Sequence, residues 1–289
     1  MKYPTFHFKK NTFRQLVIFC FLFISTIGFS QVSWPTISPE MKPGTRWWWM
    51  GSAVDKANLQ YNLEEYARAG IGTVEITPIY GVQKNDANEI PFLSEKWMNM
   101  LSFTQTINNR VGIQTDMNTG TGWPFGGPEV TVDDAASKLL IRLYKVQGET
   151  VFSEDIIPEE KDQLKVAKLL RLVAYSDKKV INLTKLIDVN GGISWKAPKG
   201  EWILMAAFNG KTLQKVKRAA PGGEGYVMDH FSTKAVKSYL NRFEKAFQTS
   251  GTAYPHNFFN DSYEVYGADW TEDFFEQFQK RRGYKLENY

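Results

Sequence analysis

Acidic and amide side chains recur where the short apolar segments of this chain end. In proteins that alternate strands and helices, the carboxyl ends of the strands build the site, so these side chains are candidates for chemistry. The set contains Glu75, Asp116, Asn118, Asp229, His230, Asp261 and Glu264. Carboxylates dominate this set and suit glycosidic chemistry, in which one acid protonates the leaving oxygen and a second carboxylate activates water or attacks the sugar.

Tryptophans are the second group that indicates sugar chemistry. Three follow one another in the segment 46–51, and Trp123 lies in the glycine- and proline-rich stretch 118–128. Indole rings offer flat apolar surfaces on which sugar faces can stack. Side chains alternate along a strand, so at least one of the three tryptophans must face the core; we expect Trp49 to face the substrate. The glycine content around Trp123 favours a binding role over ordinary packing.

The carboxylates also have structural interpretations. Glu75 could pair with Arg46 inside the sheet, and Asp116 could cap the loop that follows it. Asp261 and Glu264 could cap the turn in which they lie.

The histidines have alternatives of their own. Asp229 and His230 could form a structural hydrogen-bonded pair, and His256, next to Pro255, is interpreted as a loop residue. The histidines are too far apart in the sequence for a His-Glu-x-x-His helix, which disfavours a zinc hydrolase.

The segments that carry these residues alternate with amphipathic helices from about residue 45. The predicted strands are 46–51, 72–77, 111–118, 225–231 and 257–264. The predicted helix N-caps are Asp55, Ser94, Thr233 and Thr271. Short β/α units with loop-rich strand ends favour a (β/α)₈ barrel, and no Gly-x-Gly-x-x-Gly opens a helix as a dinucleotide fold requires. We therefore expect an α/β fold that forms part of a TIM-like barrel.

Residues 137–218 interrupt this alternation. Strand-like segments separated by charged turns predict an inserted antiparallel β module there. The expected organisation is a leader over 1–30, a first barrel segment over 31–136, the module, and a continuation of the barrel over 219–289. Without the leader and the module, too few residues remain for a barrel, which typically takes about 250; we expect a truncated N-terminal portion of one.

The N-terminus predicts export. The formal charge of +4 comes from basic residues in a leader that carries no acids, and the apolar run 16–24 and small residues follow them. This order is typical of a secretory signal, and the apolar run is shorter than the roughly 20 residues that span a bilayer. An uncleaved anchor is the alternative. We expect the protein in the periplasm, on the outer surface or outside the cell, with no later membrane span.

The remainder of the chain is neutral, and its composition excludes several functions. The single cysteine, Cys20, lies in the leader, so disulfides, thiolate metal sites and a cysteine nucleophile are not expected. Neutrality removes the bulk electrostatic reason to bind nucleic acid. The basic stretch 211–218 is interpreted as a solvated loop face. A carbohydrate is the expected partner, and the sequence does not indicate an oligomeric state.

Several segments together resemble the catalytic domain of glycoside hydrolase family 106, the α-L-rhamnosidases of pectin-degrading bacteria. The matching segments are 46–51, 69–76, 116–128, 227–231, 261–264 and 281–284. The tryptophan run and the long loop are the most specific of these, and the resemblance extends from about residue 40 to the end of the sequence. Members of this family are longer, complete the barrel and add β-sandwich domains.

The resemblance implies hydrolysis of terminal α-L-rhamnosyl groups with inversion, and a calcium ion that helps to hold the sugar. By motif match, Glu264 would be the general acid, and no residue matches the general base. The set expected to bind the sugar or its calcium is Trp49, Glu75, Asp116, Asn118, Trp123, Asp229, His230 and Asp261. Two hypotheses follow: a secreted glycoside hydrolase that acts on pectic or related glycans, and a non-catalytic or vestigial carbohydrate-binding protein that lacks the base.

Overall fold

The computed structural model describes residues 34–289. The chain divides into a unit over Met1–Ser38 and a unit over Pro39–Tyr289, and the elements described below belong to the second. The predicted signal sequence lies outside the described residues. Within 34–289, no helix combines the length and the apolar character needed to cross a membrane.

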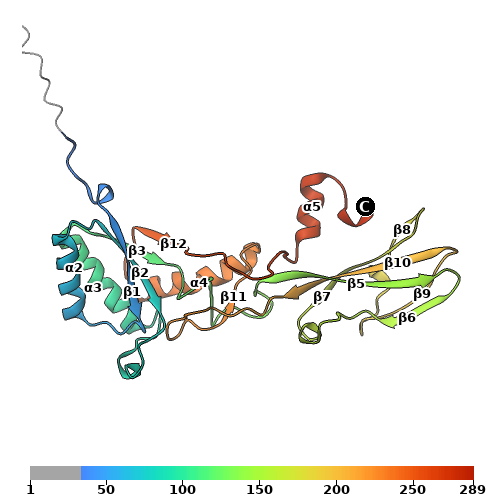
Figure 1. The fold of residues 1–289 in the computed structure, drawn as a ribbon, viewed down its shortest axis with the longest axis horizontal. Coiled ribbons are helices and arrows are strands. Elements are labelled where there is room, and N and C mark those ends of the chain that lie inside the picture. The colour runs from blue at the N-terminus through green and yellow to red at the C-terminus, as the bar shows by residue number, and fades with distance from the viewer. Residues whose placement is uncertain (1–33) are drawn as a thin grey trace, which may run out of the picture. The chain divides into compact units, whose positions relative to one another are not determined.

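A four-stranded parallel sheet carries the N-terminal part of the second unit (Figure 1). Its order is β1 (Gly44–Met50), β2 (Thr73–Ile79), β3 (Gln114–Asn118) and β12 (Asn257–Phe259). The helices beside it are α2 (Lys56–Arg68), α3 (Glu95–Val111) and α4 (Thr233–Ser250). The mixed α/β class is thus confirmed. In the part of the chain that the structure describes, the sheet is open, with β1 and β12 at its edges, and does not close into a barrel.

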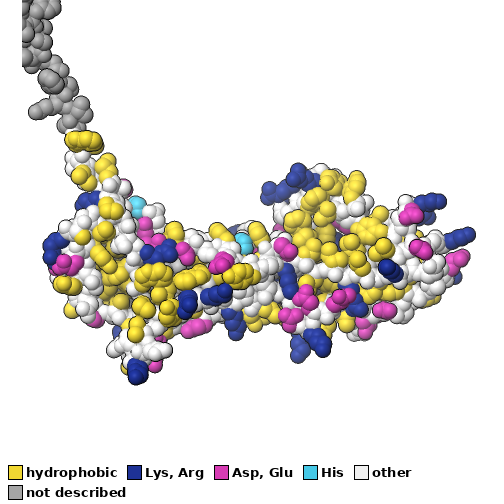
Figure 2. All heavy atoms as spheres, in the orientation of Figure 1, with side chains coloured by type: hydrophobic (Ala, Val, Ile, Leu, Met, Phe, Trp, Pro, Cys, Tyr) yellow, Lys and Arg dark blue, Asp and Glu magenta, His cyan; other side chains and the backbone are white. Residues whose placement is uncertain are grey.

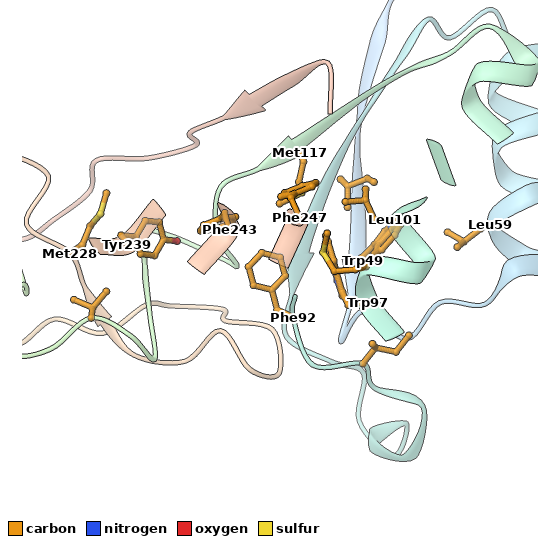
Figure 3. Close-up of a cluster of buried hydrophobic side chains, with 14 of the residues drawn as sticks. Trp49, Leu59, Phe92, Trp97, Leu101, Met117, Met228, Tyr239, Phe243 and Phe247 are labelled. Atoms are coloured by element: carbon orange, nitrogen blue, oxygen red, sulfur yellow. The ribbon is translucent and has the colours of Figure 1, made fainter. Parts of the chain in front are cut away.

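One face of this sheet packs against the three helices and forms the main hydrophobic core (Figure 3). Trp49, Ile76 and Met117 come from three neighbouring strands and are at most 1 % exposed. Trp97 of α3 and Phe243 of α4 pack against them from the helix layer. Helices α2, α3 and α4 therefore cover one face of the parallel sheet. The side chains on the opposite face are available to form a site.

The segment 225–231 does not join the parallel sheet, contrary to the sequence prediction. Only β11 (Tyr226–Val227) is a strand, and it pairs antiparallel with β4 (Gly126–Gly127). Glycine makes this close pairing possible, because a Cβ on Gly126 would lie 2.1 Å from the Tyr226 carbonyl oxygen. β12 lies directly beside β3 instead, so the described chain has four parallel strands rather than five.

The helix starts agree with the sequence in the first half of the chain and differ in the second. The predicted caps Asp55 and Ser94 both accept a backbone N–H at the start of their helices. Ser232, rather than Thr233, caps α4. Thr271 caps no helix; its hydroxyl hydrogen-bonds a buried aspartate, and α5 (Phe274–Arg282) begins three residues later.

The antiparallel module has two sheets and its own core. Its strands are β5 (Ser137–Gln147), β6 (Val151–Asp155), β7 (Lys168–Tyr175), β8 (Val180–Asn182), β9 (Gly192–Lys196) and β10 (Glu201–Lys211). One sheet has the order β5-β10-β7-β8, and β6 pairs with β9 in the other. Trp195 and Trp202 pack edge to face in the module core, with ring centroids 5.5 Å apart. Phe275 of α5 packs on this module rather than on the parallel sheet.

Short 3₁₀ helices occupy several connections. They are η1 (Pro39–Met41), η2 (Asp86–Asn88), η3 (Lys161–Gln163), η4 (Thr184–Leu186) and η5 (Leu286–Asn288).

Candidate active site

A row of polar side chains crosses the face of the parallel sheet that the helices leave uncovered. The strand register aligns Arg46 with Glu75, Glu75 with Asp116, and Asp116 with Asn257. Arg46 Nε lies 3.2 Å from Glu75 Oε1, which also accepts a hydrogen bond of 2.8 Å from Thr77 Oγ1. The sheet itself therefore places cationic, acidic and amide groups side by side.

Arg46 lies at the β1 end of this row and pairs with two carboxylates. Its Nη2 lies 3.0 Å from Asp261 Oδ1, so the chain that leaves β12 reaches back to the first strand. The guanidinium carbon lies 5.2 Å from the Phe259 ring centroid and 5.7 Å from that of Trp48. The carboxylates of Glu75 and Asp261 are thus held around one cation, and the side chains of all three residues remain partly exposed.

Asp116 has a separate set of partners on the neighbouring strand. Its Oδ1 accepts a hydrogen bond of 2.9 Å from the Asn257 backbone N–H and lies 3.4 Å from His256 Nδ1. His256 precedes β12, as its loop interpretation requires, yet it lies beside a candidate site carboxylate. No local pattern in the sequence indicates this contact, because 140 positions separate the two residues.

Asn118 lies in the next row of the sheet, opposite Phe259. It is completely buried, and neither its amide oxygen nor its amide nitrogen has a hydrogen-bond partner among the described residues. Buried polar groups are normally paired. Because this amide has no exposed surface, a ligand hydroxyl does not reach it in this conformation, and the sugar-binding role of Asn118 stays a prediction.

The tryptophan that faces the open side of the sheet is Trp48, and the prediction for Trp49 is wrong. Trp49 is 1 % exposed and packs on Trp97 in the helix-facing core, whereas Trp48 is 42 % exposed. Strand alternation causes the difference, because Trp48 shares a face with Arg46. The Trp123 ring lies 6.2 Å from that of Trp48, so the two indoles from distant segments form one aromatic surface.

Glu264 lies apart from the row of carboxylates. It is exposed, its Oε1 accepts a hydrogen bond of 2.6 Å from the Tyr266 hydroxyl, and its backbone N–H bonds Ser262 Oγ. Tyr266 also contacts Lys217, which pairs through its backbone with Trp123. Glu264 is therefore connected to the aromatic surface through Tyr266 and Lys217 rather than through the sheet.

Asp229 does not belong to the open face, contrary to the sequence prediction. It is 3 % exposed and accepts hydrogen bonds from Ser137 Oγ, Thr271 Oγ1 and the Phe231 backbone N–H. These hydrogen bonds are structural contacts. They join β5 to the segment that precedes α4 and to the segment that precedes α5. The reason lies in the segment 225–231, which pairs with β4 instead of entering the parallel sheet.

His230 lies next to Asp229 and packs among aromatic rings. Its ring centroid lies 4.2 Å from that of Phe231 and 5.1 Å from that of Tyr263. Burial lowers the pKa of His230, and the Asp229 carboxylate opposes this by raising it. A neutral imidazole beside Tyr263 can act as a hydrogen-bonding group for a ligand, although no contact in the structure connects it to Arg46.

A sequence model of glycoside hydrolase family 106, described as alpha-L-rhamnosidase, matches residues 36–169 and 157–289. The chain belongs to this family. The resemblance seen in the sequence motifs is thereby confirmed, and the protein is placed among the glycoside hydrolases.

Two further comparisons bear on the fold and on the extent of this family 106 chain. A Formosa agariphila protein, provisionally named a beta-glucuronidase, is 28 % identical over 294 residues, which cover 86 % of this chain and 25 % of the relative. The solved rhamnosidase of Novosphingobium sp. PP1Y matches with a TM-score of 0.68 at 14 % identity, over 88 % of this chain and 41 % of that one. The chain thus spans about a quarter of the relative's length and less than half of the solved chain.

The calcium ion implied by the family resemblance stays a prediction, because amide and backbone carbonyl oxygens can also bind calcium. Calcium takes six to eight oxygen ligands. Among residues 34–289, no group of three or more His, Cys, Asp or Glu side chains is placed to hold a metal ion. The Arg46 guanidinium lies between Glu75 and Asp261, so these two acids already surround a cation.

Proposed function

We propose that this family 106 chain provides the sugar-binding face of an α-L-rhamnosidase-type glycoside hydrolase acting on pectic or related glycans. The observation that supports it is the row Arg46, Glu75, Asp116 and Asn257 beside the indoles of Trp48 and Trp123. This row lies on the face of the parallel sheet that would become the interior of a barrel. Family membership supplies the reaction class.

The proposed site residues bind the sugar in two ways, by aromatic stacking and by hydrogen bonding. Trp48 and Trp123 offer an apolar surface to one face of the sugar ring, including the methyl group of a 6-deoxysugar. Glu75 and Asp116 accept hydrogen bonds from sugar hydroxyls. Arg46 holds Asp261 against the sheet, which keeps the acidic groups in fixed positions.

Glu264 is the proposed general acid. A protonated Glu264 would transfer its proton to the glycosidic oxygen as the bond to the departing sugar breaks. In an inverting reaction a second carboxylate, roughly 6.5–9.5 Å from the first, activates the attacking water. Among residues 34–289, no carboxylate matches the general base of the family.

The alternative is a protein that binds rhamnosyl groups without cleaving them. It is favoured by the engagement of Glu75, Asp116 and Asp261 with Arg46 or His256, which leaves no unpaired carboxylate in the row to act as base. Export to the periplasm, outer surface or medium is part of either proposal, on the basis of the leader composition alone.

Release of 4-nitrophenol from 4-nitrophenyl α-L-rhamnopyranoside tests the two proposals. The purified chain is expected to release it faster than it cleaves the matched β-D-glucuronide, in assays with calcium and with EDTA. Saturable binding of L-rhamnose without turnover would favour the non-catalytic alternative. Faster cleavage of the glucuronide would contradict the rhamnosyl assignment.

A further inference from the structure

The basic stretch 211–218 is not simply a solvated loop face. Lys211 is 1 % exposed, whereas Lys217 and Arg218 are exposed and fixed along the candidate site. The Lys217 and Trp123 backbones exchange hydrogen bonds of 2.9 Å and 3.0 Å. The Arg218 carbonyl accepts one of 3.0 Å from the Tyr80 N–H, just beyond the carboxyl end of β2. The stretch therefore forms a rim beside the aromatic surface.

Three exposed cationic side chains of this rim, Lys215, Lys217 and Arg218, are held against aromatic rings, and Lys217 and Arg218 are the two beside the candidate site. Lys217 Nζ lies 4.5 Å from the Tyr266 ring centroid, and the Arg218 guanidinium carbon lies 5.1 Å from that of Tyr80. Within residues 34–289, Lys217 and Arg218 take part in none of the ion pairs, which involve other lysines, other arginines and His256. Two positioned positive charges thus remain without a carboxylate partner.

The backbone at this rim is under constraint. Arg218 has φ 61°, in the left-handed region that residues other than glycine seldom occupy. Gly122 packs so closely against it that a Cβ there would lie 2.0 Å from the Lys217 carbonyl oxygen. Conformations of this kind carry an energetic cost and concentrate at functional positions.

We propose that Lys217 and Arg218 form an anion subsite for the acidic group of the sugar next to the rhamnosyl group. The inference rests on the proposed function, in which Trp123 marks the rhamnosyl position and Glu264 the departing oxygen. Tyr266 contacts both Glu264 and Lys217, so the subsite lies on the side of the departing sugar. Lysine and arginine bind carboxylates and sulfates through charge-assisted hydrogen bonds. The substrate class is thereby narrowed to acidic glycans.

Calorimetric binding to three matched disaccharides tests this subsite. Each carries a terminal α-L-rhamnosyl group, joined to a neutral hexose, to the corresponding hexuronate, or to the hexose 6-sulfate. The wild-type chain is expected to bind an acidic form about tenfold more tightly than the neutral form, as one or two partly exposed charge contacts allow. The hexuronate and sulfate arms identify which acid is preferred. The preference is expected to shrink in about 0.5 M salt, which screens exposed charges.

Variants that remove the charges identify the residues that cause the preference for acidic disaccharides. Lys217→Gln and Arg218→Asn together are expected to bring the acidic-to-neutral affinity ratio to about one; asparagine tolerates the left-handed backbone at position 218. Lys237→Gln, an exposed lysine on α4, is the matched control and is expected to keep the wild-type ratio. Circular dichroism and thermal unfolding check that each variant is folded.

The possible outcomes distinguish a failure of the anion subsite from a failure of the rhamnosyl site. Equal binding of the acidic and neutral disaccharides by the wild-type chain would overturn the anion subsite and leave the rhamnosyl site standing. A preference that survives in the double variant would also overturn it, because the charges would then lie elsewhere. Failure to bind any of the three disaccharides would overturn the rhamnosyl site and the subsite with it.

Discussion

Replacing Glu264 with glutamine is expected to lower kcat/KM for methyl α-L-rhamnopyranoside by about 10²–10⁴-fold, the usual contribution of a general acid. The amide can still accept the hydrogen bond from the Tyr266 hydroxyl, so the local structure is retained. What it loses is the proton that the departing methoxide needs. Initial rates of rhamnose release from the methyl glycoside measure the effect.

The leaving group distinguishes an acid from a binding residue. 4-Nitrophenolate departs with little protonation, so Glu264→Gln is expected to cost much less on the 4-nitrophenyl glycoside than on the methyl glycoside. Glu201→Gln, at an exposed position of β10 in the module, is the matched control and is expected to behave as wild type. Equal losses on the two substrates would remove Glu264 from the acid role.

Replacing Asp229 with alanine is expected to lower the free energy of unfolding by about 3 kcal/mol. Asp229 accepts hydrogen bonds of 3.2 Å and 3.0 Å from Ser137 Oγ and Thr271 Oγ1. Ser137 Oγ also accepts one of 3.0 Å from Lys211 Nζ, an ammonium that is 1 % exposed. Burial lowers the pKa of Lys211, and the Asp229 charge opposes this. Without the carboxylate, a buried cation loses its compensating charge. Urea unfolding followed by tryptophan fluorescence measures the difference.

Asp177→Ala is the matched control for the loss of stability expected from Asp229→Ala. Asp177 lies in an exposed turn of the module, so its removal is expected to change stability by no more than about 0.5 kcal/mol. If Asp229→Ala leaves stability unchanged and abolishes rhamnose binding, the residue has the substrate role that the sequence predicted. The structural network described above would then be wrong.

Local rules were enough to predict the first three strands of the sheet and its first helices. Short apolar segments located β1, β2 and β3, and the caps Asp55 and Ser94 follow from helix chemistry. The alternation of side chains along a strand also decides between the tryptophans, because the residue that shares a face with Arg46 is Trp48 rather than Trp49.

Contacts between distant segments could not be predicted in this way. Arg46 meets Asp261 only because the chain after β12 crosses back to β1, a path that no local pattern encodes. Residues 225–231 are apolar enough for a sheet strand, but paired glycines bring them to β4 instead. This antiparallel pairing of β11 with β4 places Asp229 inside the protein. The position of Lys217 between Trp123 and Tyr266 is likewise a result of tertiary pairing.

The indole N–H signals of the tryptophans test whether the open sheet face binds the rhamnosyl group. In ¹⁵N–¹H spectra of the chain titrated with L-rhamnose, we expect the Trp48 and Trp123 signals to shift together along one saturable curve. The Trp195 and Trp202 signals come from the module core and are expected to stay in place. Single Trp→Phe variants assign the signals. Shifts at Trp195 and Trp202, with none at Trp48 and Trp123 at saturation, would show that the rhamnosyl group does not bind on the open sheet face.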